Sequence, residues 1–340
     1  MCGLGRLRAR TDARGLLAHA HHGVPRLGEG YTTDDNARAL LYLSLLPEGA
    51  RDEGLVRTYL AFLLHMQKED GRFRNGLTLD GRFEDEGEAE DPTGRAVLAL
   101  AAAQRLPPPY AGPAREALLR ALPALEGFTS LRGRAYALLG LLALPKEPFL
   151  EAAEALGEGL LRAFREAEPA WPYPGPLTYA NHRPVEALYA YGLAFRRQEA
   201  VALARRALAF LKEHYFTPGE EGLFFDPVGN RFMARGRDKP LFDQQPIEAK
   251  CALLAHLRFG ERVLAEVAFL WFHGRNRLRA PLVDAFGPMD GLTPHGPNQN
   301  RGAEALLAYL LAWQALVQGV FPQVDEGVAL GRVFALGGRP

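Results

Sequence analysis

The stretch GYTTDDNARAL, residues 30–40, places a cluster of polar side chains directly before an apolar helical segment. The cluster contains Asp34, Asp35, Asn36 and Arg38. Aspartate and asparagine are preferred helix N-caps, because their side-chain oxygens accept hydrogen bonds from the free N–H groups of the first turn. One cap needs only one side chain. We therefore predict that Asp34 caps the helix, that Asp35 is available for chemistry, and that Arg38 is a candidate partner for either aspartate.

The apolar residues downstream and elsewhere repeat with the helical period, as in Leu306, Leu307, Leu310 and Leu311. This period predicts about twelve helices along the chain, with boundaries uncertain by about 2–4 residues. The predicted starts lie near residues 12, 34, 52, 92, 113, 131, 148, 183, 199, 246, 261 and 301. Strand signals are scarce, and only GLFFDP and GRFRNG are interpreted as short hairpin arms within loops.

The connections between these helices alternate in length, which predicts an all-α fold, an (α/α)6 barrel or six-hairpin toroid. Connections after the even helices are short, and those after the odd helices are mostly long, with GFTSL as the exception. Short connections make antiparallel neighbours, so the long ones emerge on one face, where function usually resides. The long connections are 23–33, 67–91, 166–182, 214–245 and 275–300. A flat solenoid is the rival topology, but the chain has no fixed repeat period to support it.

The domain prediction is one barrel over residues 1–340, with 317–340 as a C-terminal tail packed on it. The 340 residues are 48% hydrophobic and carry 40 basic and 40 acidic side chains, so no nucleic acid partner is expected. No apolar run approaches the roughly 20 residues of a membrane span, so we expect no membrane partner and a soluble, cytoplasmic protein. The abundance of arginine and proline fits a GC-rich or thermophilic source.

A similar polar cluster stands at the start of most predicted even helices. The blocks are FEDEGEAEDPTGR, WPYPGPLTYANHRP, LFDQQPIEAK and DAFGPMDGLTPHGPNQNRGAE. Capping alone could explain one residue in each cluster, namely Asp34, Asp91, Asn181, Asp243 or Asn300. The surplus of carboxylates, amides and aromatic rings around one depression indicates a carbohydrate site. The predicted substrate-binding residues are Tyr31, Asp34, Asn36, Arg38, Trp171, Tyr179, Asn181, His182, Gln244, Gln245, Glu248, Asp290, Asn298, Asn300 and Glu304.

We expect neither a metal nor another cofactor. His19, His21 and His22 lie close together, but only His19 and His22 would share a helical face, and no zinc signature follows. The two cysteines, Cys2 and Cys251, suggest neither a disulfide framework nor a zinc site.

The blocks GYTTDDNARAL, EAEDPTGRAV, LFDQQPIEAK and MDGLTPHGPNQNRGAEALLAYL together resemble a bacterial family of six-hairpin, glycosidase-like proteins. Members of that family are often fused to, or named after, glycosyltransferases. The resemblance implies an (α/α)6 barrel, carbohydrate chemistry and possible association with a glycosyltransferase. The aspartate pair also resembles that of some six-hairpin endo-mannanases. The chain departs from the family pattern before the second helix, where the usual DHTG opening is absent and Asp12 stands without a following His-Thr.

The mechanistic hypothesis is glycoside hydrolysis by two carboxyl groups, one protonated and one ionised. We assign Glu90 or Asp91 as the acid and Asp35 or Asp243 as the base, because a helix N-terminus stabilises a charged carboxylate. Glu248, one turn inside its helix, also fits the acid. Analogy with other six-hairpin glycosidases favours inversion over retention.

Several alternatives remain open on the same barrel. A sugar epimerase, lyase or phosphorylase is one, and an epimerase or lyase would make His182 or His295 central. A terpene cyclase toroid is more distant, because the long polar loops argue against an apolar pocket. A non-catalytic glycan-binding partner of a glycosyltransferase is the last, and carboxylates all engaged in salt bridges would favour it.

Overall fold

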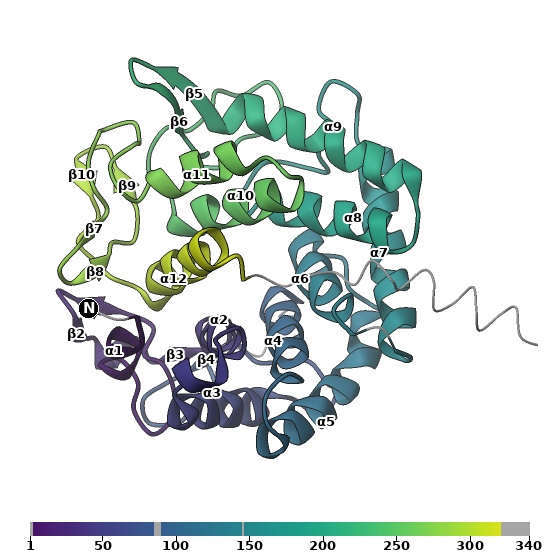
Figure 1. The fold of residues 1–340 in the computed structure, drawn as a ribbon, viewed down its shortest axis with the longest axis vertical. Helices are drawn as coiled ribbons and strands as arrows, with labels where there is room; N and C mark the ends of the chain where they lie inside the picture. The colour runs from purple at the N-terminus through teal and green to yellow at the C-terminus, as the bar shows by residue number, and fades with distance from the viewer. Residues whose placement is uncertain (1–2, 85–89, 145, 321–340) are drawn as a thin grey trace, which may run out of the picture.

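The computed structural model describes residues 3–84, 90–144 and 146–320, and it forms a closed ring of paired helices (Figure 1). The described helices are α1 (Gly3–Arg8), α2 (Thr33–Ser44), α3 (Glu53–Met66), α4 (Glu90–Ala103), α5 (Pro108–Leu125), α6 (Leu131–Leu141), α7 (Phe149–Glu166), α8 (His182–Ala194), α9 (Gln198–Tyr215), α10 (Pro246–Arg258), α11 (Arg262–Leu270) and α12 (Ala303–Gln318). Each even helix contacts the next even helix, and α12 contacts α2 to close the ring. The predicted (α/α)6 barrel is therefore confirmed.

The even helices form the inner wall, and α3, α5, α7, α9 and α11 lie outside them (Figure 1). Small residues allow the inner helices to approach closely. A Cβ added at Gly94 of α4 would lie 2.4 Å from the carbonyl oxygen of Gly133 in α6, and one at Gly140 would lie 2.7 Å from the Cα of Leu98. Side chains are buried on nearly every face of α4, which is why its sequence is rich in alanine rather than strongly amphipathic.

Five antiparallel two-stranded ribbons lie in the long connections before α2, α4, α10 and α12. They pair β1 (Ala20–His21) with β2 (Val24–Pro25), β3 (Tyr31–Thr32) with β4 (Gly76–Leu77), β5 (Phe216–Gly219) with β6 (Gly222–Phe225), β7 (Val283–Asp284) with β8 (Gly287–Pro288), and β9 (Leu292–Thr293) with β10 (Gly296–Pro297). The hairpin arm predicted from GLFFDP is β6, whereas GRFRNG contributes only its last glycine to β4. The polar connections therefore meet at the N-terminal ends of the inner helices.

The first predicted helix is wrong. Instead of a helix from residue 12, the chain forms the short α1 and then a tight turn in which Asp12 Oδ1 accepts hydrogen bonds from the N–H groups of Arg14 and Gly15. The segment that follows pairs with the lead into α12, where Ala303 N donates to Ala18 O at 2.8 Å. The helix predicted from residue 113 begins earlier, at Pro108, because Pro108 occupies a first-turn position and needs no N–H partner.

The single domain with a C-terminal tail over 317–340 stays a prediction. The helix α12 continues to Gln318 and so includes the first two of those residues. Most of the proposed tail, 321–340, and the acidic segment 85–89 lie outside the described residues. None of the helices in the described ranges is both long and apolar enough to cross a membrane.

Candidate active site

A polar cavity of about 390 Å³ lies at the N-terminal ends of α2, α10 and α12. Its lining residues are Ala18, His19, Thr32, Asp34, Asp35, Arg38, Gln245, Pro246, Asp290, Asn298, Gly302, Glu304 and Ala305. We call this space the polar cavity. It brings together seven of the residues predicted from the sequence, and four of its side chains are carboxylates. None of the described lining residues is Tyr, Trp or Phe, so the aromatic residues predicted to bind substrate, Tyr31, Trp171 and Tyr179, do not lie in its wall.

The N-cap of α2 is Thr32, and the prediction that Asp34 caps this helix is wrong. Thr32 Oγ1 accepts a hydrogen bond from Asp35 N at 3.1 Å and lies 2.8 Å from Asp35 Oδ2, to which it donates. The threonine hydroxyl therefore caps the helix and also donates a hydrogen bond to the carboxylate of Asp35. The carboxylate of Asp35 is thereby held beside the N-cap, whereas that of Asp34 makes no capping contact with any described residue.

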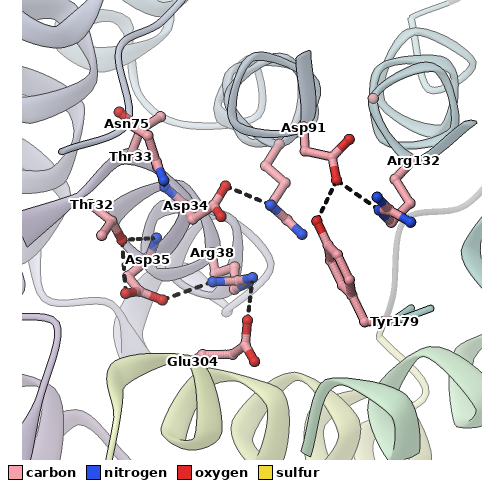
Figure 2. A network of polar contacts seen from close by, with 12 residues as sticks. Thr32, Thr33, Asp34, Asp35, Arg38, Asn75, Asp91, Arg132, Tyr179 and Glu304 are labelled. Carbon is pink, nitrogen blue, oxygen red and sulfur yellow. Dashed lines mark hydrogen bonds and ion pairs between the residues drawn. The ribbon is translucent and has the colours of Figure 1, made fainter. Parts of the chain in front are cut away.

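The two aspartates bind different arginines (Figure 2). Asp34 Oδ1 accepts a hydrogen bond from Arg95 Nη1 of α4 at 2.6 Å. Asp35 Oδ1 accepts one from Arg38 Nη1 at 2.8 Å, which confirms Arg38 as a partner. The other terminal nitrogen of Arg38 donates to Glu304 Oε2 of α12, also at 2.8 Å. Arg38 thus links two carboxylates from opposite ends of the sequence.

Asp35 is the cavity carboxyl with a perturbed acidity. Its residue is only 6% exposed, and this burial raises the pKa of Asp35 to about 6. The positive charge of Arg38 opposes that rise, while the negative charge of Glu304 adds to it. Asp35 can consequently exist as a protonated acid in mildly acidic solution, although the sequence analysis favoured it as a base.

Asn300 forms hydrogen bonds with two residues of the cavity wall, His19 and Asp290. Its Nδ2 donates to His19 Nδ1 at 2.8 Å and to the carboxylate of Asp290. Asp290 also accepts a hydrogen bond from the N–H of Gly302, at the start of α12. Because His19 Nδ1 accepts in this arrangement, the proton of the neutral ring lies on Nε2. Asn300 does not line the cavity but positions two residues that do.

Asp91 belongs to a neighbouring polar group (Figure 2). Its Oδ2 accepts hydrogen bonds from Arg132 Nε at 2.8 Å and Tyr179 OH at 2.6 Å, and its Oδ1 accepts one from Ser130 Oγ. Burial alone would raise the pKa of Asp91, but the charges of Arg132 and Arg95 and these hydrogen bonds hold it below the ordinary value. A carboxylate held ionised in this way is poorly suited to donate a proton.

Some predicted site residues support the loops instead of lining the cavity. Glu90 accepts hydrogen bonds from the N–H groups of Thr129 and Ser130 just before α6. Asn36 is fully buried, accepts from Leu16 N and donates to Thr32 O.

Tyr31 and Gln244 also have supporting contacts. The hydroxyl of Tyr31, another buried residue, donates to Asp12 at 2.5 Å. Gln244 accepts from Trp271 Nε1 and donates to Asp226.

Glu248 and Asn181 form a buried connection between α10 and the loop before α8. Glu248 Oε1 accepts from Ala180 N at 2.6 Å, and Asn181 Nδ2 donates to Tyr215 OH at 2.7 Å. Burial raises the pKa of Glu248 to about 8, so it has the acidity expected of a protonated acid. It does not, however, belong to the lining of the polar cavity.

Other predicted residues lie elsewhere. Trp171 packs against Phe210 and donates to Gly175 O, away from the cavity. Asp243 is exposed, with a φ of 60°. His182 is fully buried, neither ring nitrogen has a partner among the described residues, and His295 is exposed.

The remaining cap predictions also require correction. The N-cap residues of α10 and α12 are Gln245 and Gly302, so neither Asp243 nor Asn300 occupies the predicted position. Asn181 does occupy the N-cap position of α8, but its side chain makes no capping hydrogen bond. Its Oδ1 accepts from Thr178 N instead.

The sequence analysis missed His19, Thr32, Arg95 and Arg132 as parts of the site. One available signal was the repeated spacing of an aspartate and an arginine four residues later, in Asp34–Arg38 and Asp91–Arg95. Such spacing places both side chains on one helical face. In the structure, however, an ion pair forms between two helices. Asp34 of α2 binds Arg95 of α4 rather than Arg38 of its own helix. Within the described ranges, no cluster of three or more His, Cys, Asp or Glu side chains could hold a metal ion.

No protein-family model and no curated protein matches the chain. Solved structures do match over nearly its whole length. Cellobiose 2-epimerase from Bacillus thermoamylovorans B4167 aligns with a TM-score of 0.67 and 9% identity, covering 91% of this chain and 95% of that one.

Two further solved structures show the same similarity. D-mannose isomerase aligns with a TM-score of 0.65 and 10% identity, covering 93% of this chain and 96% of that chain. A GH76 α-mannanase from Bacteroides thetaiotaomicron aligns with a TM-score of 0.60 and 9% identity, covering 98% and 95%. These neighbours are carbohydrate-active enzymes, and at this identity the similarity establishes the (α/α)6-barrel fold alone.

Proposed function

We propose that the chain is a carbohydrate-active enzyme that hydrolyses a glycosidic bond of an oligosaccharide in the polar cavity. The observation that carries this proposal is the convergence of Asp34, Asp35, Asp290 and Glu304 on one cavity at a ring of helix N-termini. Carboxylates accept hydrogen bonds from sugar hydroxyl groups, and a pair of carboxyl groups is what glycoside hydrolysis needs. The neighbours on the same fold, which include a GH76 α-mannanase, are compatible with this chemistry.

Asp35 is proposed as the general acid. Its pKa of about 6 lies near the pH at which a carboxyl group can donate a proton to a leaving oxygen. This role replaces the assignment of Glu90 or Asp91, because Glu90 is engaged by the backbone before α6 and Asp91 is held ionised.

Asp34 is proposed as the ionised carboxylate. Its carboxylate forms an ion pair with Arg95, and its side chain remains 22% exposed at the cavity. In the inverting reaction, Asp35 protonates the glycosidic oxygen as the C–O bond breaks. Water attacks the anomeric carbon from the opposite face and transfers its proton to Asp34. Inversion predicts about 6.5–9.5 Å between the two carboxyl groups, whereas about 5 Å would predict retention.

The decisive experiment combines a substrate screen with one matched substitution. Manno-, gluco- and galacto-oligosaccharides are incubated with the parent protein, and the best substrate is then given to Asp35→Asn. We expect kcat to fall by about 10²–10⁴-fold, the usual contribution of a positioned acid. Asp238→Asn, on an exposed loop outside the cavity, provides the control. An Asp35→Asn variant as fast as the parent would refute the assignment.

Epimerisation or isomerisation is the second candidate, favoured by His19 in the cavity wall. Such reactions need a base at a C–H position, and an imidazole is suited to that role near neutral pH. Incubation of cellobiose or mannose in D₂O distinguishes the two activities. Incorporation of deuterium at C2 of an aldose without cleavage indicates epimerisation, and incorporation at C1 of a ketose product indicates isomerisation. Release of a reducing end indicates hydrolysis.

Binding without turnover is the third candidate. Asp34, Asp35 and Glu304 all form ion pairs with arginines, which is the arrangement expected of a non-catalytic glycan-binding partner of a glycosyltransferase. Calorimetric binding of an oligosaccharide with neither cleavage nor deuterium incorporation would support this function over both enzymatic ones.

A further inference from the structure

A second, smaller cavity lies on the barrel axis, below the polar cavity. It measures about 30 Å³, and every inner helix contributes to its wall. Its polar lining residues are Arg38, Arg95, Tyr136, Arg183, Glu186, Lys250 and Arg258, and the remainder are mainly leucines. We call this space the axial cavity. It has room for one small ion or a water molecule, but not for a sugar.

Each arginine around the axial cavity pairs with a carboxylate of the described residues, whereas Lys250 does not. Arg38 binds Asp35 and Glu304, Arg95 binds Asp34, and Glu186 binds both Arg183 and Arg258. Lys250 is only 2% exposed, and no hydrogen bond or ion pair joins its ammonium group to a described residue. An unpaired charge in such surroundings is costly unless an acceptor lies nearby.

The same cavity wall contains further donors without acceptors. The Nε–H groups of Arg38, Arg95 and Arg183 and the hydroxyl of Tyr136 are buried and have no partner among the described residues. The ring of Tyr136 lies between two of these cations, with its centroid 4.6 Å from the Arg95 guanidinium carbon and 5.5 Å from that of Arg183. Native proteins rarely leave several buried donors unpaired at one place.

We propose that the axial cavity binds a small inorganic anion of the size of chloride, with Lys250, Tyr136 and the three arginines as its donors. The volume suits a monatomic ion, and the lining supplies buried donors and an ammonium group that no described carboxylate binds. Burial lowers the pKa of Lys250 to about 8, and the nearby positive charges of Arg183, Arg38 and Arg95 act in the same direction. A bound anion would favour the charged ammonium and satisfy the buried donors.

The anion has a structural consequence that does not depend on the proposed function. Arg38 and Arg95 line the axial cavity and also bind the aspartates of the polar cavity. The anion would accept hydrogen bonds from the Nε–H groups of both arginines and would therefore hold their side chains in place. Its binding should stabilise the fold whether or not the polar cavity performs chemistry.

Thermal unfolding in sodium chloride and in sodium gluconate, at equal ionic strength, tests this site. Chloride should raise the midpoint saturably by roughly 2–5 °C relative to gluconate, because it binds only the folded chain. Lys250→Met should abolish the difference, whereas Lys212→Met, exposed on α9, should retain it. An equal midpoint in both salts, or a chloride effect that survives Lys250→Met, would overturn the proposal.

A crystallographic measurement covers the case in which Lys250→Met does not fold. Crystals of the parent protein are soaked in sodium bromide, and anomalous scattering is recorded at the bromine edge. A peak in the axial cavity would support the anion site. Density for water alone, without an anomalous peak, would contradict it.

Discussion

Asp34 and Asp35 are adjacent in the chain, yet their carboxylates bind arginines on different helices. Asp34 pairs with Arg95 of α4 at 2.6 Å, and Asp35 pairs with Arg38 of its own helix at 2.8 Å. Consecutive residues on a helix are separated by about 100° around the axis, so neighbouring side chains diverge. Figure 2 shows the resulting separation of the two ion pairs. This divergence gives one helical turn two carboxylates with different surroundings.

Hydrolysis should depend on the protonated form of Asp35. Because burial raises the pKa of Asp35 to about 6, the acid form predominates below that pH and disappears above it. We therefore expect kcat/KM to decrease tenfold per pH unit on the alkaline side of about pH 6, as a single ionisation in the free enzyme. Initial rates at low substrate concentration, measured from about pH 4 to about pH 9, give this pH profile of kcat/KM. A rate that rises through pH 6 would contradict the acid role.

Thr32 should set the position of that ionisation. The hydrogen bond from its hydroxyl lowers the pKa of Asp35, so Thr32→Val should move the alkaline limb to higher pH. The same change removes the N-cap of α2 and should cost about 1 kcal/mol of folding free energy. Thr32→Ser retains the hydroxyl and should preserve both properties. The pH profile and a urea titration report the two effects, and an unmoved limb in Thr32→Val would exclude the proposed hydrogen-bond effect.

Arg38 should be more important for stability than an exposed arginine. Arg38→Met leaves Asp35 and Glu304 without their shared cation, and loss of one partner from a buried ion pair costs about 3–5 kcal/mol. The cost should be smaller at pH 5 than at pH 8, because protonated Asp35 no longer needs a counter-charge. Arg165→Met removes an exposed pair with Glu199 and should cost about 0–1 kcal/mol. Denaturant unfolding at both pH values measures these costs, and equal losses in the two variants would contradict the argument.

The close contact between α4 and α6 should not tolerate a methyl group. Gly94→Ala would place its Cβ 2.4 Å from the carbonyl oxygen of Gly133, and the required separation of two inner helices should cost about 1–3 kcal/mol or more. Gly112→Ala, in α5 with nothing within 4 Å, should cost less than Gly94→Ala, because only the steric strain before Pro113 opposes the gain in helix propensity. Thermal unfolding of the two variants measures the difference in stability. An unchanged unfolding midpoint for Gly94→Ala would show that α4 and α6 can move apart without loss of stability.

The helical periodicity and the alternating connection lengths were sufficient to predict the barrel, because both are local properties of the chain. They also predicted that polar clusters would meet at one end of the inner helices. Asp34, Asp35, Arg38, Gln245, Asp290, Asn298 and Glu304 do line one cavity. The predicted helix at residue 12 failed because that segment pairs with the chain before α12, far along the sequence.

The individual roles of these polar residues could not be predicted in the same way. Glu90 and Asp91 are neighbours in one acidic block, but Glu90 binds backbone N–H groups while Asp91 binds Arg132 and Tyr179. The sequence alone determined all but the first of the predicted helices, their pairing into a barrel and the face on which the polar residues gather. Only the tertiary structure decided which carboxylate is buried, which is paired and which lines a cavity, because burial and ion pairing depend on contacts between helices distant in the chain.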